Sequence, residues 1–452
     1  MLIALSGKKR QAGVASKLTH VDVVALGNLC VDIVVPMDVL PPKDVDYRRR
    51  MLDTLTQSPP SPASWEVGAN CNFMIAAARL GLRVAPAGHL GVDVYGAFLE
   101  QVLQEEGVGR LRRIAPIPSS SSSSCSSDTG GSSSRCGGSS SHAAPSDPGS
   151  DSSDSSSSSS NSSSSSNGGI ATTSTMDQTL LCFVLVDPDS GHSFCSRYDF
   201  GPWPLLQGIT AFEPEATQLL RGSKAVFLNG FVFDELPLNV VRGACLDAIS
   251  HGSAVFFDPG PRCHTMLEGS RREALEVVLH LSEVVLMTQE EAHTVSGEED
   301  PEAAARWVLS RPGTQTRWAV VKLGAEGAVI CVQGEGGGVV HRVPGFKVEV
   351  TDTVGCGDSF AAAVVLGYIN GASPVATLTL ANAVGAATAT GRGAGRNVAT
   401  AAKVMSLLEG QDSGAAAGAG HSASSAVGSG SRQDVPTAMQ MLLASVSQTV
   451  SV

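Results

Sequence analysis

Residues 351–360 have the sequence TDTVGCGDSF, and this stretch decides the expected fold. The residues before it, 346–350, alternate between apolar and polar side chains like a β-strand. The residues after it, 359–369, are rich in Ala and Val and are long enough for a helix. A glycine turn between a strand and a helix leaves backbone N–H groups unpaired at the helix N-terminus, where the helix dipole also favours an anion. We therefore predict an anion-binding turn here.

Asp358 lies where this turn becomes the helix. A carboxylate beside an anion site is suited to act as a general base next to the point where negative charge develops. The alternative interpretation is a plain glycine turn whose Asp caps the helix, since Asp is a favoured N-cap. The stretch is not a P-loop, because the chain contains no GxxxxGK[ST] sequence.

Composition predicts one interrupted domain rather than several. Residues 119–169 are mostly Ser, and residues 411–434 are mostly Gly, Ala and Ser, so neither segment can bury enough apolar surface to offset its ordering entropy. We predict a folded domain over residues 21–410 that is interrupted by a disordered Ser-rich insert at 119–169. A disordered tail at 1–20 precedes it, and a low-complexity tail at 411–452 follows, in which residues 435–450 have the pattern of one amphipathic helix.

Charge and cysteine usage exclude several classes of protein. A net charge of −12 without a basic stripe argues against a nucleic-acid partner. No apolar run approaches the roughly 20 residues that a membrane span needs. The ten cysteines form no CxxC pair, so neither a zinc site nor a disulfide framework is indicated. We expect a cytoplasmic protein, with a plastid or other organelle as the alternative, because residues 1–20 carry four basic residues and no acidic one.

Two stretches resemble the signatures of one family. Residues 352–358, DTVGCGD, resemble the C-terminal signature DTxGAGD of the ribokinase-like carbohydrate kinases, the PfkB family, and residues 67–81, VGANCNFMIAAARLG, resemble its N-terminal signature. The resemblance spans essentially all of the foldable chain and has both signatures in the expected order. It departs from the family at Val67, Met74, Thr288 and Cys356. It implies an α/β, ribokinase-like fold, with a mostly parallel sheet between helices and a small β lid to which residues 36–66 would contribute strands. The apolar runs at 225–230 and 254–259 are predicted to be buried strands, and residues 318–330 a strand, a turn and a second strand.

The resemblance implies transfer of the γ-phosphoryl of ATP to a hydroxyl of a small-molecule sugar or polyol, with ATP and Mg²⁺ as cofactors. Asp358 would accept the proton of the attacking hydroxyl, and the N–H groups of Gly355, Cys356 and Gly357 would stabilise the phosphoryl charge. The substrate hydroxyls would be held at Asp32, Gly68 and Asn72. From the residues alone, Asp32 and Asn72 could equally be ordinary turn and helix caps. The rival functions are a nucleoside kinase of the same fold and a catalytically silent regulatory relative.

The remaining site predictions also follow from the resemblance. Glu291 would hold Mg²⁺ mostly through water, and a monovalent cation such as K⁺ would order the turn at Asp352 and Thr353. The nucleotide would lie beside the residues in the positions of the family's nucleotide segments, which are Lys322, Gly324, Gly327 and Asn382, with Lys322 in place of the usual threonine. The alternatives are an acidic first helical turn at Glu291 and a plain hairpin turn at the two glycines. The resemblance also leads us to expect a homodimer.

Two further features have a structural and a functional interpretation. Cys356 stands where the family has Ala, at a helix N-terminus that lowers a thiol pKa, although Asp352 and Asp358 oppose this. We therefore expect a moderately reactive thiol, with a small buried side chain as the alternative. Arg48, Arg49 and Arg50 form a basic run that is either a solvated face or a receptor for a substrate phosphate.

Overall fold

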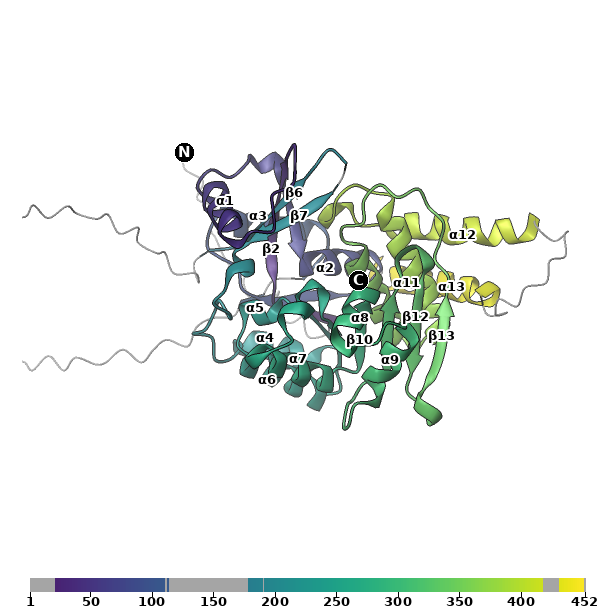
Figure 1. Cartoon of the computed structure of the whole chain (residues 1–452). Helices are drawn as coiled ribbons and strands as arrows, with labels where there is room; N and C mark the ends of the chain where they lie inside the picture. The colour runs from purple at the N-terminus through teal and green to yellow at the C-terminus, as the bar shows by residue number, and fades with distance from the viewer. Residues whose placement is uncertain (1–20, 110–111, 114–177, 190, 418–430, 451–452) are drawn as a thin grey trace, which may run out of the picture. The chain divides into compact units, whose positions relative to one another are not determined.

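The apolar runs predicted as buried strands pair side by side in one large sheet, the main sheet. The computed structural model describes residues 21–109, 112–113, 178–189, 191–417 and 431–450, and over these residues the main sheet has nine strands. They are β1 (Val23–Leu26), β4 (Val84–Gly88), β5 (Arg112–Arg113), β8 (Ala225–Asn229), β9 (Ala254–Asp258), β10 (Val284–Thr288), β11 (Trp318–Lys322), β12 (Ala328–Val332) and β13 (Val339–Val343). Their order is β13-β12-β11-β10-β9-β8-β1-β4-β5, and the neighbours from β5 to β11 run parallel (Figure 1). The predicted mostly parallel sheet is therefore confirmed, while the predicted insert at 119–169 and the tail at 1–20 lie outside the described residues.

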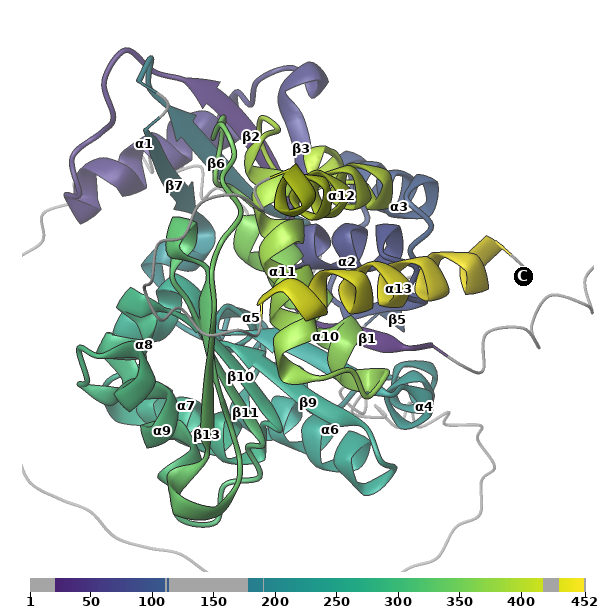
Figure 2. The same ribbon diagram turned by 90° about the vertical axis from the view of Figure 1, so that its right-hand side faces the viewer.

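Helices cover both faces of the main sheet, as parallel strands that are buried on both sides require. They are α2 (Asn70–Arg79), α3 (Val94–Glu105), α4 (Pro214–Gly222), α5 (Val232–Glu235), α6 (Leu238–Ser250), α7 (Gly269–Leu281), α8 (Gln289–Ser296), α9 (Pro301–Ser310), α10 (Cys356–Ile369) and α11 (Pro374–Ala389). In β1, Val23 and Ala25 belong to the apolar core shared with α2, α10 and α11, whereas Val24 and Leu26 belong to the core shared with α4, α6 and α7. Figure 2 shows the domain from the right-hand side of Figure 1, with α2, α10 and α11 near its centre. Short 3₁₀ helices lie in the connections: η1 (Pro62–Ser64), η3 (Arg197–Phe200), η4 (Gly260–Thr265), η5 (Gly324–Glu326), η6 (Glu335–Gly337) and η7 (Gly395–Asn397).

A second sheet forms the lid that the resemblance implies. Its strands are β2 (Leu29–Pro36), β3 (Trp65–Ala69), β6 (Leu180–Val186) and β7 (His192–Ser196), in the order β3-β2-β6-β7 among the described residues. Side chains alternate across a strand, so Asp32 lies on one face of the lid and Ile33 on the other. The register places Phe183 beside Ile33, and Cys195 beside Phe183, on the face away from Asp32.

The segment 36–66, expected to add lid strands, instead contains the helix α1 (Val45–Gln57). Asp44 caps it by accepting a hydrogen bond from the N–H of Tyr47, which stabilises a helix start. The Cys195 thiol donates to the backbone oxygen of Arg48, 3.6 Å away, so α1 lies on the face of the lid opposite to Asp32. Leu52 of α1 is buried in the apolar core of this region. The apolar face of the lid is thus covered by the chain itself.

Two chain crossings connect the lid to the main sheet at neighbouring points. The first, Gly27–Asn28, joins β1 to β2, and the second, Ala69–Asn70, joins β3 to α2. Asn28 and Ala69 have φ angles of 56° and 54°, a left-handed conformation that is uncommon outside glycine. The Asn70 side chain donates to the backbone oxygens of Leu26 and Gly27, over 3.1 and 2.8 Å, and so ties the crossings together.

The end of the chain adds two helices to the fold, so the predicted domain boundary at 410 is wrong. The helix α12 (Ala401–Ala417) runs past it, and α13 (Ser431–Val450) buries Ala438 and Leu442. The predicted helix at 435–450 is confirmed. A Cβ on Gly81 would lie 2.6 Å from the backbone of Ser445, so α13 packs directly on the turn after α2. None of the helices formed by the described residues has the length and apolar character that crossing a bilayer requires.

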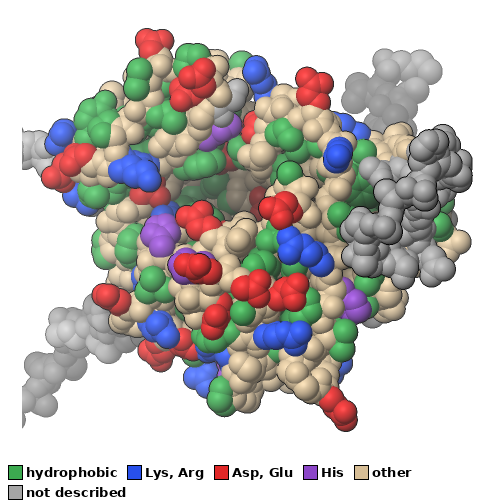
Figure 3. Space-filling model, turned by 45° about the vertical axis from the view of Figure 1, so that its right-hand side comes forward, with side chains coloured by type: hydrophobic (Ala, Val, Ile, Leu, Met, Phe, Trp, Pro, Cys, Tyr) green, Lys and Arg blue, Asp and Glu red, His purple; other side chains and the backbone are tan. Residues whose placement is uncertain are grey.

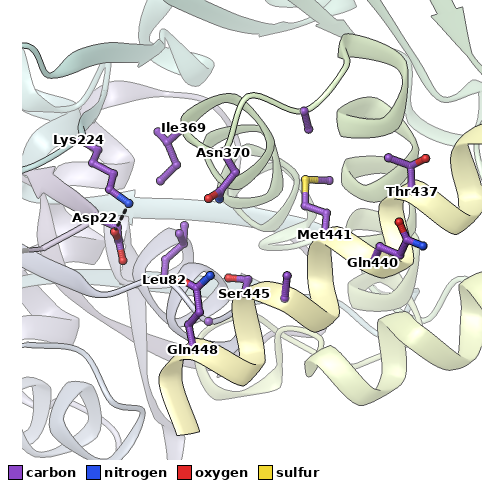
Figure 4. A pocket seen from close by; sticks show the side chains of 13 residues that line it. Asp22, Leu82, Lys224, Ile369, Asn370, Thr437, Gln440, Met441, Ser445 and Gln448 are labelled. Carbon is purple, nitrogen blue, oxygen red and sulfur yellow. Dashed lines mark ion pairs between the residues drawn. The ribbon is translucent and has the colours of Figure 1, made fainter. Parts of the chain in front are cut away.

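A cavity of about 390 Å³ lies between α13 and the body of the domain. Figure 4 shows Met441 and Gln448 of α13 on one side of it and the ion pair of Asp22 with Lys224, at 3.0 Å, on the other. Asn370, at the C-terminal end of α10, also lines this cavity. Asp358 lies in the first turn of the same helix, so the cavity is remote from the predicted site.

The strand predicted at 346–350 is absent, which corrects the sequence analysis. The described residues 344–350 have no regular structure and lead from β13 to the turn before α10. Strand β13 pairs only with β12 in the described sheet, and the following chain leaves this edge. The N–H groups of Thr351 and Asp352 instead donate to the backbone oxygen of Ala389 in α11, over 2.8 and 3.2 Å. The turn is therefore positioned by α11 rather than by a preceding strand.

Candidate active site

The glycine turn before α10 has the predicted open helix start. Gly355 is the N-cap residue with a φ of 79°, and no side chain caps the helix. The N–H of Cys356 donates to the backbone oxygen of Thr353 over 3.2 Å, so one of the three N–H groups predicted to face an anion is already engaged. The open first turn favours negative charge in front of Gly357.

Asp358 is held by a residue from the other end of the domain. Nδ2 of Asn72, in the first turn of α2, donates to Oδ2 of Asp358 over 3.2 Å. Although part of the side chain meets solvent, desolvation by the surrounding protein raises the pKa of Asp358 to about 7, and the nearby Asp258 carboxylate adds to this, while Asn72 and Lys322 act in the opposite direction. A carboxylate with a pKa near neutrality can accept a proton at physiological pH and is suited to general base catalysis.

Asp32 lies on the lid and approaches the same point. Burial raises the pKa of Asp32 to about 7, opposed by the Cys30 thiol, which donates to Oδ1 over 3.4 Å, and supported by the carboxylates of Glu66 and Asp358. A Cβ on Gly68 would lie 2.1 Å from Oδ1 of Asp32, so only glycine leaves room for this carboxylate. The structure thus brings Asp32, Gly68, Asn72 and Asp358 together.

Lys322 lies beside the glycine turn and forms an ion pair with Asp258. Its Nζ is 2.5 Å from Oδ2 of Asp258 and would be 3.6 Å from a Cβ built on Gly357. Burial alone would lower the pKa of Lys322, but the carboxylates of Asp258, Glu291 and Asp358 outweigh it and raise the pKa. Asp258 is not among the site residues predicted from the sequence. The available signal was its place at the end of β9, because ligands of open α/β sheets bind at the carboxyl ends of strands.

Glu291 is buried at the start of α8, where Thr288 replaces the asparagine of the family. Oε2 of Glu291 accepts from the N–H of Thr288 over 2.7 Å, and the Thr288 hydroxyl accepts from the N–H of Glu291 over 3.2 Å. This capping box orients the glutamate. Burial and the nearby Asp258 carboxylate raise the pKa of Glu291.

The acidic groups fit a magnesium ion that is shared with phosphates, not a preformed protein cage. Among the described residues, no three His, Cys, Asp or Glu side chains converge to hold a metal by themselves. Mg²⁺ is usually bound by one or two carboxylates together with substrate phosphates and water. Asp258 and Glu291, next to the open start of α10, match that donor set.

Asp352 connects three parts of the chain. Oδ1 accepts from the N–H of Val354 over 3.0 Å, and Oδ2 accepts from the N–H of Gly393 over 2.8 Å. Nε2 of His192, at the tip of the lid, lies 3.8 Å from the same Oδ2. The loop around Gly393, which has no role in the sequence analysis, also reaches Asn72, because the N–H of Gly395 donates to its Oδ1 over 2.8 Å. Both contacts join elements far apart in the chain, so no local pattern indicates them.

Two of the residues expected near a nucleotide, Gly327 and Asn382, contact one backbone segment, 343–345. A Cβ on Gly327, whose φ is 99°, would lie 2.1 Å from the backbone oxygen of Val343. Nδ2 of Asn382 donates to the backbone oxygens of Val343 and Pro344, both over 3.1 Å. Gly324 has a φ of 58° at the start of η5. In this structure the amide hydrogens of Asn382 therefore hold the backbone of this segment.

The expectation of a reactive thiol at Cys356 is wrong. Burial raises the pKa of the Cys356 thiol to about 12, and the carboxylates of Asp352 and Asp358 act in the same direction. The helix start does not compensate for the lost solvation and the two neighbouring negative groups. Cys356 is therefore a small, unreactive side chain at neutral pH.

Figure 3 shows a hollow below the upper part of the molecule, where the lid lies, with several acidic side chains around it. The geometry above accounts for such a cleft. The lid contributes Asp32 to this cleft, and the main domain contributes Asp358. Lys322 lies beside the open N-terminus of α10. A hydroxyl near Asp32 and a phosphoryl group near Lys322 could both reach Asp358.

Curated relatives match parts of the chain. The bifunctional protein HldE of Caulobacter sp. (strain K31) is 31% identical over 199 residues, which cover 42% of this chain and 37% of that protein. An ATP-dependent ribose-1-phosphate kinase of Halopiger xanaduensis is 32% identical over 158 residues, covering 35% and 47%. A fructokinase of Escherichia coli is 33% identical over 135 residues, covering 29% and 41%. The chain spans less than half the length of each of these relatives.

Solved structures share the fold over most of the chain. An E. coli protein described as a ribokinase II, in complex with ATP and Mg²⁺, has a TM-score of 0.59 and 18% identity, covering 86% of this chain and 99% of that one. The ribokinase of Arabidopsis thaliana, complexed with ribose and ATP, has a TM-score of 0.57 and 17% identity, with the same coverage. At these identities the likeness shows the ribokinase fold. The family described as pfkB family carbohydrate kinase matches residues 176–402, about half of the chain, and the chain therefore belongs to the PfkB family of carbohydrate kinases.

Proposed function

We propose that this protein transfers the γ-phosphoryl of ATP to a hydroxyl of a sugar or related polyol. The observation that carries the proposal is the position of Asp358. Its carboxylate has a pKa of about 7, accepts a hydrogen bond from Asn72 and lies in the first turn of α10, whose start is open to an anion. A proton acceptor and an anion site at one point are what phosphoryl transfer to a hydroxyl requires.

Each residue of the site has a role in this reaction. Asp358 takes the proton of the attacking hydroxyl, and Asp32 and Asn72 accept or donate hydrogen bonds to orient the acceptor. The N–H of Gly357 and the ammonium of Lys322 stabilise the charge on the transferred phosphoryl group. Gly68 leaves room for Asp32, and Gly355 gives the turn its left-handed conformation.

The cofactors follow from the family and the donor set. Mg²⁺ would lie near Glu291 and Asp258 and would neutralise charge on the phosphates of ATP. Gly327 and Asn382 would shape the wall of the nucleotide site through the segment 343–345, and Gly324 would let the backbone at the start of η5 approach ATP. We also propose that a monovalent cation such as K⁺ orders the turn at Asp352 and Thr353. Omitting K⁺ should then lower activity, and Na⁺ at equal ionic strength is the control.

The homodimer and the cytoplasmic or organellar location remain predictions. The lid offers little support for a dimer through its apolar face, because α1 covers the side opposite to Asp32. Sedimentation of the purified protein would test the oligomeric state directly.

The experiment that tests the function is an ATP-consumption screen over sugars, polyols, nucleosides and phosphosugars, with Asp358→Asn as the blank. Loss of the base should lower kcat by about 10²–10⁴. ATP affinity should stay within about two-fold, because the amide keeps the shape of the carboxylate. Cys356→Ala, which introduces the residue usual in the family, is the matched control and should stay active. Full turnover by Asp358→Asn on the true substrate would refute the assignment. ATP binding without turnover on any acceptor would favour the catalytically silent alternative.

A further inference from the structure

We propose that the acceptor is an electrically neutral polyhydroxylated molecule, such as a free sugar, a polyol or a nucleoside, and not a sugar phosphate or sugar acid. This inference rests on the proposed function and concerns the same site. It follows from the distribution of charged groups on the two sides of Asp358.

The acceptor side carries carboxylates that lie close together. Asp32 in β2 and Glu66 in β3 are direct cross-strand partners and lie on the same face of the lid. Asp358 approaches them from the main domain, and it and Glu66 both raise the pKa of Asp32. An additional phosphate or carboxylate here would meet like charges in a site that is partly shielded from water, where such repulsion is strong.

The arginines that lie around this side are already engaged. Among the described residues, Arg396 pairs with Glu66 at 3.1 Å, and Arg79 pairs with Glu106 at 2.8 Å. Arg262 lies between Asp199 and Asp234, at 2.8 and 2.7 Å. Each of these guanidinium groups therefore already has a carboxylate partner in the protein, although Asp234 is shared with Arg271 and Asp199 with Arg48. A substrate anion would have to compete with those carboxylates.

The basic run on α1 does not reach the acceptor either. Arg48 lies on α1, which packs on the face of the lid away from Asp32, and its guanidinium faces Asp199 at 3.8 Å. Arg49 is more than half exposed and lies over the ring of Phe200. The interpretation of this run as a receptor for a substrate phosphate is therefore not supported by the structure.

On the side of Asp32 away from Glu66, toward β6 and β7, the neighbouring groups on this face of the lid are uncharged. The register places Cys182 beside Asp32, and Ser196 beside Cys182, on that face. Farther along, Val34 and Phe194 expose 39% and 45% of their surface. Thiol, hydroxyl and apolar side chains of this kind suit a neutral molecule with hydroxyl groups and a less polar edge.

The positive charge lies on the other side, where the phosphoryl donor would be. Lys322 and the open start of α10 are beside Gly357, and Asp258 already neutralises part of the charge of Lys322. One cation and one helix terminus thus serve the transferred phosphoryl group, whereas each guanidinium group described above on the acceptor side already has a carboxylate partner. Family membership does not settle this point, because the matched relatives include both a fructokinase and a ribose-1-phosphate kinase.

Matched acceptor pairs test the inference on the wild-type protein. The pairs are fructose and fructose 6-phosphate, ribose and ribose 1-phosphate, adenosine and AMP, and glucitol and gluconate, with Asp358→Asn as the blank. In the pair that contains the best acceptor, kcat/KM should be at least about 100-fold higher for the neutral member. The anionic member is disfavoured because its charge is repelled by the carboxylates in this partly shielded site. A higher kcat/KM for an anionic member would overturn this inference and leave the proposed function standing. No turnover above the blank with any compound would overturn the proposed function, and this inference with it.

A charge variant tests the physical cause. Glu66→Gln removes one carboxylate beside Asp32 and frees Arg396 from its partner. The ratio of kcat/KM for the anionic member to that for the neutral member should rise by about 10-fold or more. Glu276→Gln, which removes the carboxylate that pairs with Arg272 on α7 and with Arg311, is the control and should leave the ratio unchanged. An unchanged ratio in Glu66→Gln would contradict the electrostatic cause, and if this variant does not fold, the wild-type pairs decide alone.

Discussion

Nδ2 of Asn72 donates to Oδ2 of Asp358 over 3.2 Å, although 286 residues separate the two in the chain. The other end of the same amide, Oδ1, accepts from the N–H of Gly395 over 2.8 Å. One side chain at the start of α2 therefore positions both Asp358 and the loop that also reaches Asp352. The two signature regions of the chain meet at this amide.

The pH dependence of activity should report the raised pKa of Asp358. A base works only when deprotonated, so kcat/KM should rise with pH and level off above an apparent pKa near 7. Because Asp32 has a similar pKa, the rise of kcat/KM with pH reports the joint titration of Asp32 and Asp358. Asp258→Asn should move this rise to lower pH, since the Asp258 carboxylate raises the pKa of Asp358. The measurement is kcat/KM from pH 5 to 9, and a shift to higher pH would contradict the electrostatic assignment.

Gly68→Ala should disrupt acceptor binding while leaving the nucleotide side intact. The new Cβ would lie 2.1 Å from Oδ1 of Asp32, so the carboxylate has to move. We expect kcat/KM for the acceptor to fall by about 10²-fold, which corresponds to the loss of about one charged hydrogen bond, with little change in ATP affinity. Gly243→Ala, a helical site with nothing within 4 Å of the new Cβ, is the matched control. Equal kinetics of the two variants would show that Asp32 does not contact the acceptor.

Acid should destabilise the fold through Asp22. Burial alone would raise the pKa of Asp22, but Arg83 and Lys224 lower it to about 2. Because the folded pKa lies below the unfolded value, the stabilisation is complete above about pH 4 and is lost as the pH falls toward 2. Asp22→Asn should cost about 1–2 kcal/mol at pH 7, a figure reduced for the solvent exposure of both partners.

The check is urea denaturation of both proteins from pH 7 to pH 2.5. The difference in the free energy of unfolding should shrink as the pH falls. A constant difference would mean that Asp22 contributes through packing rather than through charge.

Gly81→Ala should loosen the C-terminal helix. Gly81 has a φ of 89°, and its Cβ would lie 2.6 Å from the backbone of Ser445 in α13. Gly371 has a similar φ of 68°, but a Cβ there would have nothing within 4 Å, so Gly371→Ala measures the conformational cost alone. We expect about 1 kcal/mol of destabilisation for Gly371→Ala and about 2–4 kcal/mol for Gly81→Ala. Hydrogen exchange should show faster exchange in α13 for Gly81→Ala alone, and equal exchange in both variants would argue against the contact.

Cys356 should resist alkylation at neutral pH. With its pKa raised to about 12, almost none of the thiol is in the reactive thiolate form at pH 7.5. Wild type and Cys356→Ala should therefore lose activity at the same rate in iodoacetamide. Peptide mapping of the modified cysteines provides the measurement, and selective labelling of Cys356 that ATP prevents would refute the expectation.

Much of the main sheet could be predicted from the sequence because its strands are short apolar runs separated by helical patterns. The runs at 225–229, 254–258 and 318–322 each become a strand in the expected place. The strand predicted at 346–350 failed because alternation shows which residues could form a strand but not whether a neighbouring strand is available. The helix α1 was missed for a related reason, since the resemblance, not the local sequence, suggested strands there.

The site was predicted only where motifs carry it. Asp32, Asn72 and Asp358 were selected by their places in the signature regions and the strand that precedes them, and the structure brings them together. The pair of Lys322 with Asp258, the contact of Asn72 with Gly395, and His192 beside Asp352 depend on how distant elements pack. Such contacts have no local pattern. Cys356 shows the same limit for chemistry, because its pKa depends on burial and on two carboxylates as well as on the helix start.

The two crossings at Asn28 and Ala69 also have a mechanical consequence. Asp32 belongs to the lid, beyond these crossings, whereas Asp358 and Lys322 belong to the main domain, so the spacing of Asp32 and Asp358 depends on the backbone geometry at the two crossings. The Asn70 amide holds the first crossing by donating to the backbone oxygens of Leu26 and Gly27. A change in this geometry would alter the spacing of Asp32 and Asp358, while the pair of Lys322 and Asp258 lies within the main domain.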